Sequence, residues 1–375
     1  MKIAYDLRYA DGHFTGIGTH AYALLESLLA LPGNERYAVL WNPDLGRPRY
    51  RLDRIAAHPR VTWNAERFSP IHPIGTVQVG AWLRRIRPAV YFSPFYLLPV
   101  AARCPCVLTI HDVWPLRLPE GFSWARWLLY RASLFAARRA RFIVTSSEFS
   151  RSEIITLVHV PPERVRSIPP GVPPRLAPVE SSRPNRLPEA PFALTVGDNR
   201  PRKNLAVLAR AWARMGPEPS LELVSAGPND RRYPSLADLA QSEGARRVTS
   251  LGWVSEGELD WLYGRAEVVL FPTVYEGFGF PLAEAFARGV PTVASDIPVL
   301  HEIGDGVARF ADPQDPDRWA EEVARLVRSP EEGLRLRALG RQRGQELSFQ
   351  RTAEGYLALL REVGGEGREP NSQNG

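Results

Sequence analysis

Short apolar runs alternate with helix-like patterns along most of this chain. The runs of four to six residues predict strands, and the stretches in which apolar residues recur every three or four positions predict helices. Regular alternation of strand and helix is typical of a doubly wound parallel α/β sheet. In the first half, strands are expected at 2–7, 37–41, 61–64, 89–93, 106–111 and 142–146, and helices at 17–31, 73–86, 123–140 and 148–158.

A proline-dense stretch interrupts the alternation, with ten prolines from Pro161 to Pro191. Proline lacks a backbone N–H and has a fixed φ, so the stretch is neither a helix nor a central strand. The alternation then restarts, with strands expected at 192–196, 221–225, 248–251, 268–271, 291–294 and 308–310. We therefore expect an N-terminal Rossmann-like domain at 1–170, a linker at 171–190, a second Rossmann-like domain at 191–347, a terminal helix at 348–363 and a disordered tail at 364–375.

The most informative stretch, residues 268–289, combines a strand, a glycine-rich loop and a helix. Glu276 lies in the loop with Gly277 and Gly279, and Glu284 is expected in the first turn of the helix. A helix N-terminus offers unpaired N–H groups and the positive end of its dipole, which favour a phosphate. Carboxylates beside it suit hydroxyl groups, so the pattern predicts a site for a nucleotide sugar.

A basic turn follows the first strand of the second domain, where Arg202 and Lys203 lie at an expected helix start. Two cations beside a helix N-terminus favour a diphosphate. Among the 47 basic residues only Lys2 and Lys203 are lysines. Because arginine and lysine are not equivalent where a compact charge must fit, the lysine retained at position 203 is a hint of function.

Composition narrows the class of protein. The 375 residues suggest two domains, and 44% hydrophobic and 23% charged residues are ordinary for a globular protein. No apolar stretch is long enough to span a membrane, and the N-terminus has a strand pattern instead of that of a signal peptide. The pair Cys104 and Cys106 has neither disulfide nor zinc spacing, which fits a reducing cytoplasm. The net charge is +6, but the basic residues do not form an obvious nucleic-acid-binding motif.

The Glu-x7-Glu pattern with Gly-Phe-Gly inside it resembles the signature of retaining family 4 (group 1) glycosyltransferases. The resemblance implies the GT-B fold, with two Rossmann-like domains facing a central cleft and the last helix packed back on the first domain. It implies a nucleotide-sugar donor as substrate, with no separate cofactor and no metal. In such enzymes the residues matching Arg202 and Lys203 neutralise the diphosphate.

The same resemblance assigns roles within the glycine loop. Glu276 is expected to hold hydroxyls of the transferred sugar, Glu284 those of the ribose, and the backbone of Gly277, Phe278 and Gly279 the phosphate and sugar. Many relatives carry an arginine directly after the first glycine of the second domain. This chain has Asp198 there, with Arg200 two residues on, so whether Arg200 shares the task stays open.

The first domain carries two further candidate groups. Gly16 and Gly18 follow the first strand and are expected to form a loop that opens a helix at Thr19. By resemblance this loop closes over the donor diphosphate. His111 begins a His-Asp-x-x-Pro-Leu-x-x-Pro-Glu string similar to that of mannosyltransferases of bacterial surface polysaccharides, which implies a position near the donor sugar and favours GDP-mannose over a UDP-hexose.

The helix pattern at 123–142 mixes tryptophans and leucines with five arginines. It suits peripheral contact with an anionic membrane, as a lipid-linked acceptor would require. It equally suits an amphipathic helix packed on the sheet with a solvated arginine face, and both interpretations stay open. The protein is thus expected in the cytoplasm, with the inner membrane face as a further place of action.

Two alternatives keep the fold but change the activity. A GT-B sugar-nucleotide epimerase would need no acceptor, and the Glu-x7-Glu pattern argues against it. A non-catalytic partner in a glycosylation complex would tolerate loss of Arg202, Lys203, Glu276 or Glu284, yet all four are present. The acceptor, the linkage and the oligomeric state are not readable from these residues.

Overall fold

The structure is a computed structural model that describes residues 1–10, 15–44, 50, 52–118, 123–172, 180–216 and 219–366. The chain divides into two compact units: unit 1 is Met1–Leu176 with Ser348–Gly375, and unit 2 is Ala177–Leu347. The division falls in the expected linker, of which residues 173–179 lie outside the described part, as do residues 367–375 of the expected tail.

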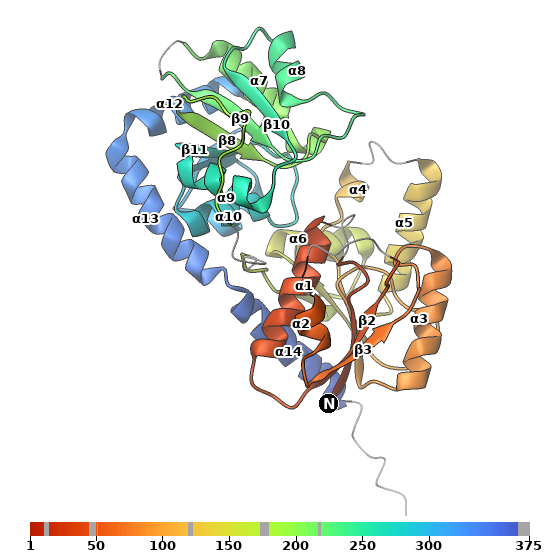
Figure 1. The fold of residues 1–375 in the computed structure, drawn as a ribbon. Helices are drawn as coiled ribbons and strands as arrows, with labels where there is room; N and C mark the ends of the chain where they lie inside the picture. Colours follow the sequence, from red (N-terminus) through yellow and green to blue (C-terminus); the bar gives the residue numbers. More distant parts are fainter. Residues whose placement is uncertain are drawn as a thin grey trace, which may run out of the picture. The chain divides into compact units, whose positions relative to one another are not determined.

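Unit 1 is built on a seven-stranded parallel sheet with the order β3-β2-β1-β4-β5-β6-β7. Figure 1 labels its strands β2 and β3. The inner strands β4, β5 and β6 are buried at every residue, as is typical of parallel sheets, whereas the edge strand β3 is partly exposed. Strand β7 was not predicted, because it lies within the proline-dense stretch. It is an edge strand that pairs with β6 alone, so it needs fewer backbone N–H donors than a central strand. The strands are β1 Lys2–Asp6, β2 Arg36–Trp41, β3 Val61–Ala65, β4 Val90–Ser93, β5 Cys106–Thr109, β6 Phe142–Thr145 and β7 Val165–Ser167.

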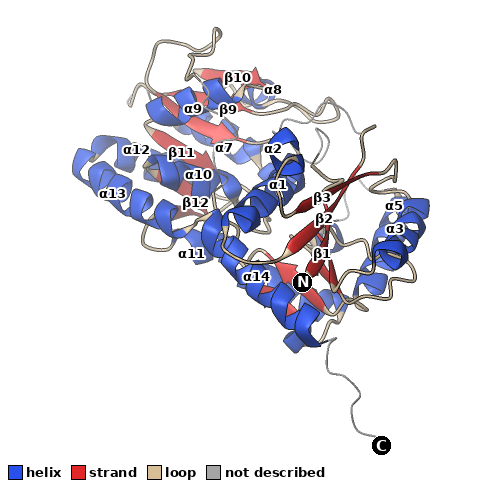
Figure 2. Ribbon diagram, turned by 60° about the horizontal axis from the view of Figure 1, so that its bottom comes forward, coloured by secondary structure: helices blue, strands red, loops and turns tan. Residues whose placement is uncertain are grey.

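Helices cover both faces of this sheet, blue against red in Figure 2. One core cluster joins the sheet to α1 and α14, and a second joins its other face to α3 and α5. The helices of unit 1 are α1 Thr15–Ala30, α2 Leu52–Ala56, α3 Pro73–Ile86, α4 Trp114–Arg117, α5 Trp124–Ala137, α6 Glu148–Glu153 continued by a π-helical turn Ile154–Val158, a 3₁₀ turn Pro162–Arg164, and α14 Phe349–Glu366.

The terminal helix α14 completes the core of unit 1. Tyr356 and Leu360 are buried in the cluster that also holds α1, and Thr352 donates a hydrogen bond to the Pro169 carbonyl at 3.0 Å. The helix runs three residues beyond its expected end at 363, so the expectation of disorder from 364 is wrong for residues 364–366. The reason is close packing, because a Cβ on Gly364 would lie 2.2 Å from the sulfur of Met1.

Unit 2 repeats the architecture with a six-stranded parallel sheet, ordered β10-β9-β8-β11-β12-β13. Two core clusters again lie on opposite faces, one with α7 and α12 and the other with α9 and α10. The strands are β8 Phe192–Val196, β9 Glu222–Ala226, β10 Val248–Gly252, β11 Val268–Phe271, β12 Thr292–Ser295 and β13 Arg309–Ala311. The helices are a 3₁₀ turn Pro201–Lys203, α7 Leu205–Arg214, α8 Leu236–Ser242, α9 Glu256–Arg265, α10 Phe280–Arg288, α11 Pro298–Gly304, α12 Pro316–Arg328 and α13 Pro330–Glu346.

Both sheets are doubly wound, so each has a point where the strand order reverses. In unit 1 this point lies between β1 and β4, and in unit 2 between β8 and β11. Loops diverge at such a point and leave a crevice at the carboxyl ends of the strands, where ligands of open α/β sheets bind. Cys104 and Cys106 are both free thiols, as expected. Within the described residues, no helix is long and apolar enough to cross a membrane.

Candidate active site

The reversal point of unit 2 carries a pocket at the ends of β8 and β11. Gly197, Asp198, Asn199 and Lys203 are among the residues that line it, and it holds about 350 Å³ including solvent at its mouth. Gly197 has φ +145°, a conformation that favours glycine, and a Cβ there would lie in van der Waals contact with the Lys203 side chain at 3.4 Å.

Arg202 and Lys203 lie in the 3₁₀ turn that precedes α7. Asn204 closes this turn in a left-handed conformation, with φ 53°. Its side-chain amide donates to the carbonyls of Pro272, at 3.1 Å, and Pro313, at 2.7 Å. The basic turn is thereby tied to the loop after β11.

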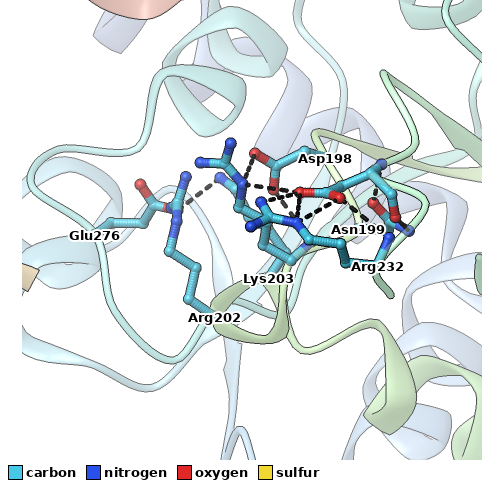
Figure 3. A network of polar contacts seen from close by, with 8 residues as sticks. Asp198, Asn199, Arg202, Lys203, Arg232 and Glu276 are labelled. Carbon is cyan, nitrogen blue, oxygen red and sulfur yellow. Dashed lines mark hydrogen bonds and ion pairs between the residues drawn. The ribbon is translucent and has the colours of Figure 1, made fainter. Parts of the chain in front are cut away.

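Both cations meet one carboxylate oxygen. Glu276 Oε1 accepts from Arg202 Nη1 at 2.8 Å and from Lys203 Nζ at 2.6 Å, as Figure 3 shows. The Thr273 hydroxyl lies 3.1 Å from the same oxygen. Burial would raise the pKa of Glu276, but the charges of Lys203 and Arg202 outweigh it and lower that pKa. The site therefore holds a largely buried carboxylate between two cations.

A second polar network borders the same pocket (Figure 3). The Asp198 carboxylate lies 3.7 Å from the Arg200 guanidinium, which also lies 3.9 Å from Asp230. Asp230 pairs with Arg232 at 2.5 Å, and Asn199 donates to the Asp230 carbonyl at 3.1 Å. Arg200 is thus held by two acids at the pocket's rim, whereas Arg202 and Lys203 contact Glu276.

The glycine loop leads into α10 through a left-handed residue. Gly279 has φ +115°, and a Cβ there would lie 2.9 Å from a methyl group of Leu300. The helix begins at Phe280, with Pro281 in its second position. Because Phe280 adds a residue ahead of the proline, Glu284 falls in the second turn, and its expected place in the first turn is wrong.

Glu284 is bonded to α9, apart from the Glu276 cluster. Its Oε2 accepts from the Tyr263 hydroxyl at 3.0 Å. Burial raises the pKa of the Glu284 carboxyl, with Arg288 and the Tyr263 hydrogen bond opposing. Its predicted contact with the ribose hydroxyls stays a prediction. The Phe278 side chain is buried beside Phe280, at 5.4 Å between ring centroids, so only its backbone can face a ligand.

Gly16 and Gly18 occupy the first turn of α1, which begins at Thr15, so the expected loop with a helix start at Thr19 is wrong. The connection from β1 runs through residues 11–14, outside the described part. Helix packing explains Gly18, because a Cβ there would lie 2.7 Å from the Tyr9 carbonyl oxygen, whereas Gly16 has open space. Their predicted contact with the donor stays a prediction.

His111 lies just beyond β5, next to the reversal point of unit 1. Its Nδ1 is 3.2 Å from the Ser146 hydroxyl, and among the described residues none pairs with its buried Nε2. Burial lowers the pKa of His111 to about 4, with a smaller opposing effect of the Pro94 carbonyl. His111 is therefore a neutral imidazole: Ser146 fixes Nδ1, and the buried Nε2 is available only in the sense that no described residue pairs with it.

The structure joins Arg202, Lys203 and Glu276 directly and places Glu284 in a neighbouring network of unit 2. Sequence reasoning missed Thr273 and Asn204, which hold the basic turn, and His20, whose ring lies 4.9 Å from that of His111. A lone histidine in a helix carries no local signal. Pro272 and Pro313 follow strand ends and therefore mark loops in the sequence. Nothing in the sequence shows that the Asn204 amide bonds to their carbonyls.

Comparison with protein families gives two matches. Residues 14–176 match the model described as Glycosyltransferase Family 4, and residues 190–329 match that described as Glycosyl transferases group 1. O-antigen chain mannosyltransferase B of Escherichia coli is 31% identical over 266 residues, covering 67% of this chain and 68% of that protein. O-antigen chain mannosyltransferase RfbU of Salmonella typhimurium is 24% identical, covering 74% and 77%.

Solved structures share the fold over nearly the whole chain. Sucrose-phosphate synthase from Thermosynechococcus elongatus superposes with a TM-score of 0.71 at 20% identity, covering 98% of this chain and all of that one. Anabaena HepE in complex with UDP and glucose gives 0.70 at 16%, covering 96% and 100%. The expected GT-B fold is confirmed.

Proposed function

The chain belongs to the family 4 glycosyltransferases, and on that premise we propose that it moves a hexosyl unit, mannosyl favoured, from a nucleotide diphosphate sugar to a saccharide or lipid-linked saccharide. Its similarity to two O-antigen chain mannosyltransferases supports this sugar and a role in cell-surface polysaccharide synthesis. GDP-mannose is the proposed donor, and a UDP-hexose is the second candidate.

The observation that carries the proposal is the pairing of two cations with one buried carboxylate at a sheet reversal point. When the bond between the transferred sugar and the diphosphate breaks, negative charge develops on the departing phosphate. Preformed cations in a site shielded from water stabilise that charge strongly. Arg202 and Lys203 are fixed there by Asn204 and Glu276 before any ligand arrives, and we assign them the role that a metal ion has in other transferases.

The remaining groups have separate tasks in the proposed reaction. Glu276, held charged by its two cations, accepts hydrogen bonds from hydroxyls of the transferred sugar. Glu284 holds the ribose, and the backbone from Gly277 to Gly279 cradles the phosphate and sugar at the start of α10. His111 positions the sugar through its available Nε2. Retention of the anomeric configuration is proposed, with the leaving phosphate accepting the proton of the acceptor hydroxyl.

The test is donor binding by thermal shift and saturation NMR against GDP-, UDP-, ADP- and dTDP-sugars, with EDTA present and no metal added. Each donor that binds is retested on Lys203→Ala and on Lys2→Ala, the variant of the only other lysine. We expect one donor to stabilise the wild type and Lys2→Ala but not Lys203→Ala. We also expect transfer to fall by about a hundredfold or more in Lys203→Ala.

Two results would contradict this proposal. Binding that needs a divalent metal would remove the proposed role of the two cations. The absence of binding to every donor would favour a non-catalytic partner of a glycosylation complex, the alternative left open by the sequence.

We further propose that unit 1 contacts an anionic membrane, where a lipid-linked acceptor would lie. Helix α5 turns Tyr130 and Leu134 into the core, yet its outer side is not merely a solvated arginine face. Trp124 and Phe135 are 80% and 69% exposed, and Ile74 of the neighbouring helix α3 is 59% exposed. Both helices cover the same sheet face and lie side by side in Figures 1 and 2. A contiguous exposed apolar patch marks an interaction site, and we propose that these side chains form one.

The charge of this region supports an anionic partner. Residues 67–147, which contain α3 and α5, carry eleven arginines and two acidic residues, a net charge of +9. The other 294 residues carry a net charge of −3, which gives the chain its +6. Basic side chains interleaved with aromatic ones suit a surface of anionic lipids.

Vesicle sedimentation tests the membrane contact. We expect binding to phosphatidylcholine vesicles only when phosphatidylglycerol is included, and weaker binding at high salt. The double variant Trp124→Ser with Phe135→Ser should lose it. The control, Trp253→Ser with Leu334→Ser, removes two apolar residues of unit 2 that are 63% and 68% exposed and should bind as the wild type does. Equal binding by both double variants would contradict the assignment to α5.

A further inference from the structure

Side chains from three separate segments of unit 1 meet beside His111. His20 of α1 presents its ring to that of His111 in a T-shaped contact, with 4.9 Å between centroids. The Tyr356 hydroxyl of α14 lies 3.5 Å from His20 Nε2 and 3.1 Å from the hydroxyl of Thr109, the last residue of β5. A continuous series of contacts therefore runs from the terminal helix to His111.

His20 is an unusual residue for this position. It is 1% exposed, and among the described residues none pairs with its Nδ1. A buried polar atom without a partner is costly, and an apolar side chain of similar size would avoid that cost. Such an atom in a native structure calls for an explanation, and a catalytic role is one of those known.

His111 is restrained on two sides by these contacts. Ser146 fixes Nδ1 at 3.2 Å, and the His20 ring limits rotation of the imidazole about its Cβ–Cγ bond. With both restraints in place, the available Nε2 keeps one direction. The orientation of Nε2 then depends on His20, and that of His20 on Tyr356.

We propose that His20 is a positioning residue for His111, and that α14 holds His20 in place through the Tyr356 hydroxyl. The inference rests on the proposed function, in which His111 Nε2 orients the reacting sugar. The donor diphosphate is assigned to Arg202 and Lys203, so a misdirected His111 slows transfer with little loss of donor binding.

Three substitutions test this. Tyr356→Phe removes only the connecting hydroxyl, and His20→Phe keeps a ring but removes both nitrogens. Tyr5→Phe is the matched control, because the Tyr5 hydroxyl is also buried and also bonds α1, through the Ala21 carbonyl at 2.7 Å. We expect kcat to fall about tenfold in Tyr356→Phe and His20→Phe but not in Tyr5→Phe. The KM for donor should stay within about twofold in all three.

Nitrogen NMR of histidine-labelled protein gives a readout independent of turnover. The ring-nitrogen signals of His111, assigned with His111→Ala, should move in Tyr356→Phe and His20→Phe and stay in place in Tyr5→Phe. Unchanged kcat and unmoved His111 signals in the first two variants would overturn the inference. Full activity in His111→Ala would instead overturn its role in the proposed function, and the NMR comparison would still decide whether His20 positions the ring.

Discussion

At the scale of single residues, Glu276 decides the charge balance of the unit 2 site. One oxygen of this carboxylate pairs with Arg202 and with Lys203, so one negative charge faces two positive ones. A buried cation that loses its partner is costly, and two neighbouring cations without one also repel each other. The carboxylate therefore keeps the two cations together at the site where we propose that the diphosphate binds.

A neutral residue at position 276 should separate binding from turnover. In Glu276→Gln the two cations face no carboxylate, so nucleoside diphosphate should bind more tightly than in the wild type. Transfer should fall by about a hundredfold or more because the amide would hold the sugar hydroxyls less strongly. Calorimetric titration with the nucleoside diphosphate and an initial-rate assay measure the two effects. Weaker diphosphate binding in the variant would show that Glu276 does not compete with the anion.

The two buried histidines of unit 1, His20 and His111, should make the stability of this unit depend on pH. The pKa of folded His111 is lowered from 6.5 to about 4, and burial together with His111 also lowers that of His20. Between pH 6.5 and 4 the unfolded chain binds protons that these folded histidines exclude, so the free energy of unfolding falls as pH drops through that range. The contribution of His111 is at most about 3 kcal/mol.

Unfolding followed by calorimetry from pH 4 to pH 7.5 measures this dependence. In His111→Asn the group no longer titrates, and the loss of stability on acidification should be smaller than in the wild type. Parallel pH profiles for the two proteins would assign the effect to other groups.

At the scale of elements, the start of α10 depends on one backbone conformation. Gly279 caps the helix with φ +115°, and the N–H groups of the first turn follow it. A side chain here meets both an unfavourable φ and the Leu300 methyl group. The orientation of the helix end therefore rests on the absence of a side chain, and the proposed phosphate contact depends on it.

Gly279→Ala should destabilise unit 2 by about 1–3 kcal/mol and weaken donor binding. Gly264→Ala is the matched control, because Gly264 lies within α9 and a Cβ there meets nothing within 4 Å. That substitution should stabilise the protein by about 0.4–1 kcal/mol, because alanine has less freedom in the unfolded chain. Chemical denaturation and donor titration compare the two. Equal stability of both variants would refute the role given to the Gly279 conformation.

Elements with a strong local pattern could be predicted from the sequence, and those set by distant partners could not. The run Val268–Phe271 is buried as β11, and the basic turn was identified from its position after a strand. Strand β7 has only three residues, and it is defined by its pairing with β6. The His20–Tyr356 contact joins residues 336 positions apart, and no local pattern encodes it.

At the scale of the whole molecule, unit 1 is assembled from two separate parts of the chain. Its main part ends at Leu176 and the rest begins at Ser348. Phe349, Tyr356 and Leu360 fill the core between α14 and the sheet. Unit 1 therefore cannot complete its hydrophobic core without the last segment of the chain.

Truncation should reveal this dependence. A chain ending at residue 347 exposes the core surface that α14 covers, so unit 1 should lose its cooperative unfolding transition and aggregate. A chain ending at residue 366 retains all of α14 and should unfold as the full chain does. Calorimetry of both truncated chains makes the comparison. A cooperative unit 1 transition in the shorter chain would contradict the role assigned to α14.

The divided unit 1 also sets an order of events during synthesis. Residues 1–176 leave the ribosome first, but the 171 residues of unit 2 follow before α14 is made. At typical rates of translation, the first unit waits roughly 10 to 30 s for its last helix. Unit 2 can close its core in that interval, so the half of the protein encoded later can be the first to finish folding.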